Sequence, residues 1–317
     1  MQYKQLGNTD MRVAPITFGC NVFGFTIDEK ASFDLLNGFT EAGFNLLDTA
    51  DVYSKWKLGN QGGESETIIG NWMKKRQNRS NIFIATKVGW DMGDGKKGLS
   101  KKYILQAVEA SLKRLQTDYI DLYQTHIDDA ETPIEETLEA YQQLINEGKI
   151  RWIGASNLSP ERLQLSLQIS KEKGLPSYQT FQPHYNLIER EIFEKELETI
   201  CIENNLGVIN YFALAGGFLT GKYRSEADLN KSLRGDGAKK YLTPKGIKIL
   251  TALDKISAEL NSTPASVAIA WLLARPSVTA PIASATSIEQ LQSLIAATEL
   301  KLTKEALEVL NDASAWE

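Results

Sequence analysis

Short apolar runs alternate with longer amphipathic stretches from one end of this 317-residue chain to the other. Parallel strands need long crossover connections, usually helices, so this alternation predicts a parallel α/β sheet. Eight strands, each followed by a helical stretch, predict a (β/α)8 TIM barrel. The expected strands are 16–18, 45–48, 82–86, 119–124, 150–155, 180–182, 207–211 and 279–283.

Several of the expected helices begin with residues that cap helices. Ser159, Thr243 and Thr263 each stand directly before a proline. A hydroxyl can accept a hydrogen bond from a free amide of the first turn, and proline suits the first helical position. The expected helical segments are 28–42, 62–76, 100–114, 132–146, 159–172, 190–205, 243–274 in two pieces, and 287–297.

Two segments fall outside the alternating pattern. Residues 3–13 contain the turn Gly7-Asn8-Thr9-Asp10 and predict an N-terminal β-hairpin that covers the bottom of the barrel. Residues 213–242, after the seventh strand, are too long for a plain connection and predict a loop that covers a cofactor. Since no Pro/Gly/Ser-rich linker divides the chain, we expect residues 1–317 to form one barrel domain.

The charge of the chain limits its partners. The net charge is −5 and the pI is near 5.4, whereas nucleic acids and anionic membrane surfaces require a basic face. The short basic clusters at 74–76 and 96–102 are typical of solvated helix ends and turns. We therefore expect neither nucleic acid nor a membrane as the main partner.

Metal binding and secretion also lack sequence signals. Cys20 and Cys201 lie far apart, without metal-ligand spacing, and the chain has only two histidines. The N-terminus has no apolar core of signal-peptide length, and no run approaches the ~20 apolar residues that span a bilayer. We expect a cytoplasmic protein with reduced thiols and no metal site.

Four polar residues lie where expected strands end: Asp48, Lys87, His126, and Tyr53 in the loop beyond Asp48. Active sites of barrels form at the carboxyl ends of the strands. A tyrosine, with an ordinary pKa of about 10, releases its proton more easily beside a buried ammonium such as that of Lys87. Asp48 can keep that ammonium charged, and His126 can polarise a carbonyl oxygen.

Each of these residues also has a structural interpretation. Alone, Lys87 could form an ion pair at the barrel mouth, and Asp48 could cap a turn. His126 alone could be a hydrogen-bonded core histidine, and Tyr53 could be a packing residue. The occurrence of all four together favours a catalytic set. The chain lacks G-x-S-x-G, a P-loop and a G-x-G-x-x-G after the first strand, so acyl transfer, phosphoryl transfer and a Rossmann dinucleotide site are not indicated.

The four residues, in this order, resemble the catalytic tetrad of the aldo-keto reductase superfamily, which lies beside a nicotinamide cofactor. The resemblance continues through GASNLS (154–159), FQPHYNL (181–187), YFALAGGFLTGKY (211–223) and APIASATSIEQL (280–291), and so covers nearly the whole chain. It implies an NAD(P)H-dependent oxidoreductase that reduces aldehydes or ketones to alcohols, or catalyses the reverse reaction. A small carbonyl or alcohol substrate and a monomer or small homo-oligomer are expected.

The resemblance also implies cofactor contacts. Ser156, Asn157 and Gln182 look like the residues that bind the nicotinamide carboxamide, and Tyr211 resembles the aromatic residue that stacks on the nicotinamide ring. A simple turn remains the alternative for Ser156-Asn157. Further expected contacts are Leu214, Gly216, Leu219 and Gly221 in the long loop, and Ser284, Thr286 and Gln290 after the last strand.

The segment after the last strand departs from many members of the superfamily, which carry a Lys or Arg there for the 2′-phosphate of NADPH. Residues 284–290 contain hydroxyls and Glu289 but no cation. The amino end of helix 287–297 and the hydroxyls can still bind phosphate. We expect NADPH as cofactor, with NADH possible, and Lys222, Arg224 or Arg234 as other sources of a cation.

Two questions stay open. Trp56, Trp90, Phe23 and Phe25 are candidates for the substrate wall, with core packing as the alternative for each. The superfamily also includes barrels that serve as channel-associated subunits. A nicotinamide-nucleotide-sensing regulatory subunit with little turnover is therefore the alternative to an enzyme.

Overall fold

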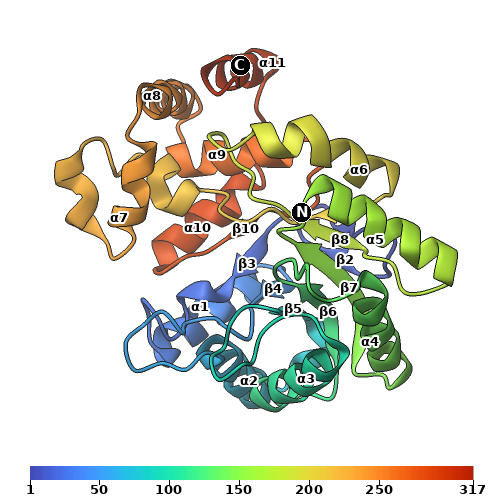
Figure 1. The fold of residues 1–317 in the computed structure, drawn as a ribbon. Helices are drawn as coiled ribbons and strands as arrows, with labels where there is room; N and C mark the ends of the chain where they lie inside the picture. The colour runs from blue at the N-terminus through green and yellow to red at the C-terminus, as the bar shows by residue number, and fades with distance from the viewer. Residues whose placement is uncertain (317) are drawn as a thin grey trace.

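The computed structural model describes residues 1–316, and its centre is a curled sheet of eight parallel strands (Figure 1). The strands follow the order β10-β3-β4-β5-β6-β7-β8-β9. Their bounds are β3 (Thr17–Gly19), β4 (Leu46–Asp48), β5 (Phe83–Val88), β6 (Ile120–Thr125), β7 (Ile150–Ser156), β8 (Thr180–Gln182), β9 (Gly207–Val208) and β10 (Ile282–Ala283).

Contacts between the last two strands close the sheet. Val208 of β9 forms an isolated parallel bridge with Val278, and the amides of Thr279 and Ile282 donate to the carbonyls of Val208 and Asn210, both at 2.9 Å. The first and last strands are already paired through β10 and β3. The predicted (β/α)8 barrel is confirmed, although β9 and β10 are shorter than expected because their pairing continues as isolated bridges.

Helices surround the strands in Figure 1. The predicted caps are present: the hydroxyls of Ser159, Thr243 and Thr263 accept from amides of the following turn at 3.1 to 3.2 Å. Expected segment 190–205 contains a π-helical turn, η3 (Phe193–Leu197), that continues into α6 (Glu198–Glu203). The other helices over the barrel are α1 (Glu29–Glu41), α2 (Glu64–Arg76), α3 (Lys101–Leu115), α4 (Ile134–Asn146), α5 (Pro160–Lys173), α8 (Pro244–Glu259), α9 (Pro264–Leu273) and α10 (Ile288–Ala297).

One of the longer helices was not predicted. Helix α11 (Lys304–Ala313) follows α10 near the C-terminus and lies beside α8. Its Thr303 caps the first turn, and Leu310 is fully buried. Asn311 accepts a hydrogen bond from the indole of Trp271 on α9 at 2.9 Å. The helix belongs to no β/α pair, so the alternating pattern gave no reason to expect it.

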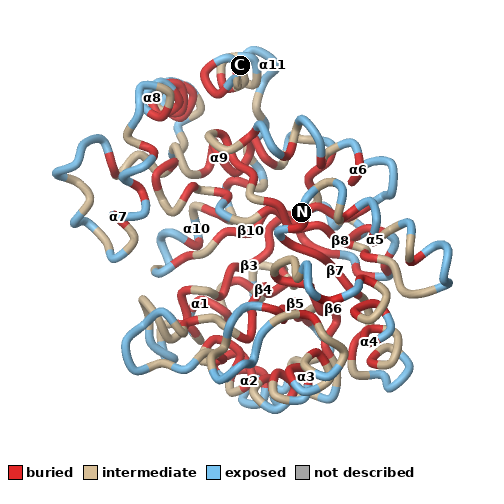
Figure 2. The backbone as a smooth tube through the Cα atoms, viewed as in Figure 1, coloured by how far each residue is buried: buried red, intermediate tan, exposed pale blue. Residues whose placement is uncertain are grey.

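The predicted N-terminal hairpin is confirmed. Strands β1 (Lys4–Gln5) and β2 (Arg12–Val13) pair antiparallel. Leu6, Met11 and Val13 pack against apolar side chains from the strands and their approaches, and this cluster lies apart from the larger core between sheet and helices. Since the partners lie below the tetrad along their strands, the hairpin covers the amino-terminal end of the barrel. These partners include Leu46, Ala85, Leu122, Ile209 and Ala280. Figure 2 shows the barrel strands buried and the outer helix faces exposed.

Residues 213–242 are an ordered excursion. They contain η4 (Ala215–Thr220), η5 (Glu226–Lys231), α7 (Gly235–Ala238) and η6 (Lys239–Tyr241), and α7 projects at the left edge of Figure 1. Arg224 anchors the segment through two bonds to the Asp254 carboxylate of α8, at 2.6 and 2.7 Å. Within residues 1–316, no helix is long and apolar enough to cross a bilayer.

Candidate active site

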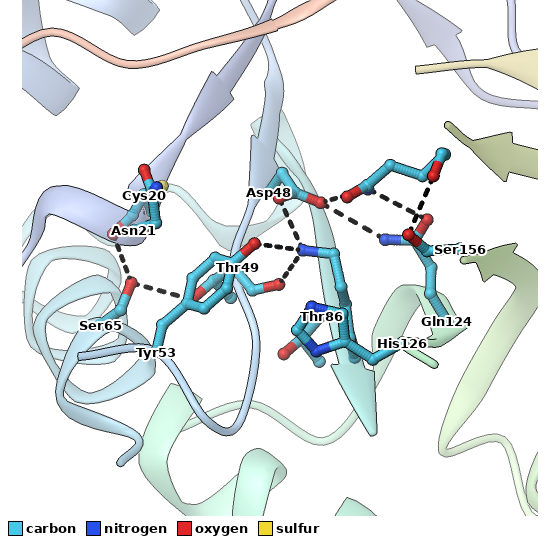
Figure 3. Close-up of polar contacts among 12 residues, drawn as sticks. Cys20, Asn21, Asp48, Thr49, Tyr53, Ser65, Thr86, Gln124, His126 and Ser156 are labelled. Atoms are coloured by element: carbon cyan, nitrogen blue, oxygen red, sulfur yellow. Dashed lines mark hydrogen bonds and ion pairs between the residues drawn. The ribbon is translucent and has the colours of Figure 1, made fainter. Parts of the chain in front are cut away.

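Three of the four predicted catalytic residues meet at one ammonium. Lys87 Nζ lies 2.6 Å from Asp48 Oδ2, 2.7 Å from the Thr49 carbonyl and 3.0 Å from Tyr53 Oη. Figure 3 shows Asp48, Thr49 and Tyr53 joined by dashed lines to a single nitrogen atom. Asp48 ends β4 and Lys87 lies near the end of β5. Since β4 and β5 are neighbours in the sheet, their side chains reach each other inside the barrel.

The loop after β4 is folded tightly enough to return Tyr53 to the ammonium. Ser54 adopts a left-handed conformation with φ of 75°, and its hydroxyl donates to the Phe23 carbonyl at 2.6 Å. The Asn60 amide donates to the carbonyls of Ser54 and Gly24. These contacts fix the loop to residues 23 and 24, which follow η1 (Cys20–Val22), and thereby hold the Tyr53 phenol in place.

Asp48 has partners on both oxygens. Its Oδ2 contacts Lys87, while Oδ1 accepts from Gln182 Nε2 at 2.9 Å and from Gln124 Nε2 at 3.4 Å. Gln182, expected at the nicotinamide carboxamide, thus donates to the Asp48 carboxylate. Sequence reasoning missed this contact and missed Gln124, since both are 76 or more residues from Asp48.

The electrostatic balance keeps the phenol neutral. Burial raises the pKa of Tyr53 to about 12, and the Lys87 ammonium opposes this rise. Lys87 therefore lowers the pKa of Tyr53, as predicted, although desolvation is the larger of the two effects. Burial alone would lower the pKa of Lys87, yet Asp48 and Tyr53 together hold it above its ordinary value. The lysine is charged and the tyrosine holds its proton.

His126 follows β6 directly and is buried. Its ring lies edge-on to Tyr53, with centroids 5.9 Å apart, and edge-on to Trp90 at 5.8 Å. Burial, together with Lys87, holds the pKa of His126 well below its ordinary value, so the imidazole is neutral. Its Nδ1 is buried and has no hydrogen-bond partner among residues 1–316. The tetrad thus contains a neutral ring.

A cleft of about 1090 Å³ opens above the tetrad. Lys87 lies beneath its floor. Two predicted contacts do not line it: Leu219 is fully buried in the core, and a side chain at Gly221 would meet Arg224. The predicted residues that line it are Asp48, Tyr53, His126, Ser156, Asn157, Gln182, Tyr211, Leu214, Gly216, Ser284, Thr286 and Gln290.

Trp56 and Trp90 line the cleft and are partly exposed. Phe25 packs edge-on against Trp56, with centroids 5.9 Å apart, while Phe23 is fully buried and packs in the core. Of the four candidates for a substrate wall, the two tryptophans therefore border the open space. Phe212, which sequence reasoning did not single out, lines it as well.

Ser156 and Asn157 form part of a chain of hydrogen bonds beside the tetrad. The Ser156 hydroxyl donates to the Gln182 carbonyl, and the Asn157 amide donates to the His126 carbonyl, both at 2.9 Å. The Tyr211 hydroxyl donates to Asn157 Oδ1, also at 2.9 Å. Asn157 has a left-handed φ of 54°, as in a turn. Residues 156 and 157 thus form a turn and also line the cleft with polar side chains.

The far end of the cleft lies between residues 284–290 and the long excursion. Ser284 donates to Asn21 at 2.8 Å, while the amide and hydroxyl of Thr286 donate to Gln290 at 2.9 and 3.1 Å. Asn21 was missed because it follows a short strand and belongs to no motif. The excursion adds the cations of Lys222 and Arg234 to the lining.

These two cations differ from their neighbour Arg224. Arg224 is paired with Asp254, whereas neither Lys222 nor Arg234 forms an ion pair within the described chain. A side chain at Gly216 would meet open space. Unpaired cations, hydroxyls and an open glycine suit a phosphate-bearing ligand. Residues 1–316 contain no group of three or more His, Cys, Asp or Glu side chains that could hold a metal ion.

The barrel and its buried Asp-Tyr-Lys-His site define the class of protein. The model of the Aldo/keto reductase family matches residues 15–315, and the chain belongs to this family. It is 37% identical to the uncharacterized oxidoreductase YrpG of Bacillus subtilis (strain 168), over 98% of this chain and 95% of that protein. The family and its oxidoreductase members support an oxidoreductase that uses a nicotinamide cofactor and a small carbonyl substrate.

Other similar proteins differ in their described roles. The chain is 34% identical to a probable voltage-gated potassium channel subunit beta of Oryza sativa subsp. japonica, over 92% of this chain and 89% of that protein. It is 30% identical to the L-glyceraldehyde 3-phosphate reductase of Escherichia coli (strain K12), over 94% of this chain and 87% of that protein. Similarity alone thus does not separate an enzyme from a channel subunit.

Proposed function

We propose that this protein is an NAD(P)H-dependent reductase of aldehydes or ketones in which Tyr53 is the general acid. The observation that carries the proposal is the pair of contacts from the Lys87 ammonium to Tyr53 Oη and Asp48 Oδ2. A lysine held charged beside a neutral phenol stabilises the phenolate that forms once the proton has left. An alkoxide is basic enough to take that proton from the phenol.

The cleft suits a nicotinamide dinucleotide. Its volume lies near the upper end of ordinary ligand pockets. Tyr211 offers an aromatic face near the tetrad, and Lys222 and Arg234 offer cations for the phosphates. When bound, the reduced cofactor supplies the hydride. Among the other expected contacts, Leu214 and Gly216 border the same space, whereas Leu219 supports the loop from within the core.

The chain's own residues have distinct roles in this proposal. Tyr53 gives its proton to the carbonyl oxygen, and Lys87 and Asp48 stabilise the phenolate that remains. The neutral His126 orients the carbonyl without carrying a competing charge. General acid help of this kind supplies roughly 10²- to 10⁴-fold, and positioning of the two reactants supplies much of the remainder. The same residues can oxidise an alcohol in the reverse direction.

For the cofactor, we propose that both NADPH and NADH bind, with NADPH preferred. The hydroxyls of residues 284–290 favour NADPH, whereas Lys222 and Arg234 serve the pyrophosphate that both cofactors share, and Glu289 in the lining opposes the additional phosphate. The preference is expected to be modest because neutral bonds to phosphate are only about half as strong as charge-assisted ones.

A regulatory subunit that senses nicotinamide nucleotides is the second candidate. The observation that favours it is the similarity to the plant proteins described as potassium channel subunits. Such a protein would bind the cofactor in the same cleft but would turn over very slowly. The complete tetrad favours the enzyme.

Turnover of 4-nitrobenzaldehyde with NADPH or NADH distinguishes the two candidates. For the enzyme, Tyr53→Phe should lower kcat at least about tenfold while cofactor affinity stays nearly unchanged, because the hydroxyl serves proton transfer and not binding. A variant that keeps more than about a tenth of the wild-type kcat would refute Tyr53 as the principal acid. Cofactor binding with negligible turnover by the wild-type protein would favour the sensor.

A further inference from the structure

Tyr211 borders the cleft, and the ring of His184 stacks on its phenol ring. The imidazole of His184 lies nearly parallel to the Tyr211 phenol, with centroids 5.1 Å apart and planes inclined by 13°. Tyr211 lines the cleft and His184 does not. The phenol therefore lies between the imidazole and the open space.

Other contacts hold the edges of the Tyr211 ring. Its hydroxyl donates to Asn157 at 2.9 Å. The Phe212 ring meets both Tyr211 and His184 edge-on, each at 5.4 Å between centroids. Phe212 has a left-handed φ of 54°, a conformation that residues with a side chain adopt uncommonly. The rings of His184 and Phe212 and the hydrogen bond to Asn157 thus fix the orientation of the phenol.

The backbone at these residues is fixed without the imidazole. The Asn186 side-chain amide donates to the Phe212 carbonyl at 3.0 Å, and the Asn210 side-chain amide donates to the Tyr185 carbonyl at 2.7 Å. The Tyr211 amide donates to the Pro183 carbonyl at 2.9 Å. These ties cross between the ends of β8 and β9, so replacing the side chain at 184 should leave the backbone in place.

The His184 side chain has no other evident task. Its Nε2 is buried and has no hydrogen-bond partner within residues 1–316. Burial lowers its pKa, with Glu189 opposing and Lys240 assisting, so the ring is neutral near pH 7. A buried polar atom without a partner costs free energy, which a purely apolar residue at this position would avoid. The contacts that the imidazole does make are the stack on Tyr211 and the edge-on contact with Phe212.

We propose that His184 is a positioning residue whose imidazole backs the Tyr211 ring and holds that ring flat for a bound nicotinamide. The inference rests on the proposed function. A phenol that is already ordered loses little freedom when a planar ligand stacks on it, whereas a mobile phenol must be ordered at binding. His184 is then a source of cofactor affinity although it does not border the cleft.

The test compares three replacements by titrating the protein's intrinsic fluorescence with NADPH. His184→Ala removes the ring and should weaken the dissociation constant about three- to tenfold, the effect of leaving one side chain to be ordered. His184→Phe restores a flat ring and should return affinity to within about twofold. His184→Leu fills the space without a flat ring and should remain close to His184→Ala.

Phe44→Leu provides the matched control. Phe44 is buried beside the start of β4, away from the cleft, and stacks on Phe39 with centroids 4.9 Å apart. The Phe44→Leu variant should be less stable than the wild-type protein but should bind NADPH with the same affinity. If His184→Ala does not fold, the comparison of His184→Phe with His184→Leu decides the matter.

The outcomes separate this inference from the proposed function. Equal NADPH affinity in wild type and all folded His184 variants would overturn the inference alone, as would full restoration by leucine. Wild-type protein that binds neither NADPH nor NADH would refute the proposed function, and the inference with it.

Discussion

The Lys87 ammonium lies 3.0 Å from the Tyr53 hydroxyl, with the lysine side chain fully buried and the tyrosine bordering the cleft. Burial and charge act on this pair in opposite directions. Desolvation raises the pKa of the phenol, while the ammonium lowers it, and desolvation is the larger effect. In the proposed mechanism, the lysine therefore acts mainly by stabilising the phenolate once the proton has left.

Lys87→Met should lower kcat by about 10²-fold or more, since the phenolate then forms in a buried site without a cation. It should also destabilise the fold by about 3 to 5 kcal/mol, because Asp48 keeps a buried charge without its partner. The double variant with Asp48→Asn should recover stability but not activity. The effect on activity is measured as kcat across a range of pH, and the effect on stability is measured by urea unfolding. A near-normal rate with an unchanged pH profile would remove Lys87 from the mechanism.

Lys222→Gln and Arg234→Gln should each weaken binding of NADPH and NADH by about 10- to 100-fold, the effect of losing one hydrogen bond to a charged group. The two cofactors share their pyrophosphate, so both should be affected alike. Arg224→Gln is the matched control, because Asp254 already pairs with that arginine. A loss confined to NADPH would instead assign the altered cation to the 2′-phosphate.

Thr286→Arg should raise the NADPH to NADH ratio of kcat/KM, since residues 284–290 contain hydroxyls but no cation. The expected gain is about tenfold, equivalent to about 1.4 kcal/mol. Both cofactors are measured with both proteins. A wild-type preference above about a thousandfold, equivalent to about 4 kcal/mol, would mean that a cation from the excursion already reaches the phosphate.

Because of Asp51, the free energy of unfolding should decrease as the pH rises. Both of its carboxylate oxygens are buried without a partner among the described residues. Burial, followed by the neighbouring Glu66, raises its pKa to about 8, whereas an unfolded aspartate titrates near pH 4. The native form thus retains a proton that the unfolded chain has lost, and the stability from that proton disappears between about pH 4 and pH 8.

Asp51→Asn should therefore stabilise the protein more at pH 8 than at pH 5. The gain is at most about 1.4 kcal/mol for each pH unit across this window. Urea unfolding at the two pH values provides the measurement. The control is Asp34→Asn, which alters an exposed carboxylate on α1 and should have little effect at either pH. An equal gain at both pH values would contradict a raised pKa at Asp51.

Local signals in the sequence determined the barrel and the tetrad. Apolar runs, hydroxyl caps and Pro at first turns act over a few residues, so the eight strands and most helices could be predicted from them. Asp48, Lys87 and His126 could be predicted to meet because the ends of parallel strands share one edge. Helix α11 lies outside this periodic order and was missed.

Only the tertiary structure decided which side chains contact one another. The contact of Gln182 with Asp48, the stack of His184 on Tyr211 and the burial of Leu219 all depend on segments that lie far apart in the sequence. The same holds for Arg224, which is paired, and Arg234, which borders the cleft. A sequence gives the charge and shape of each side chain, but desolvation and hydrogen-bond partners arise only when distant segments pack. Desolvation and these partners determine the pKa values of the site and which of its cations remain unpaired.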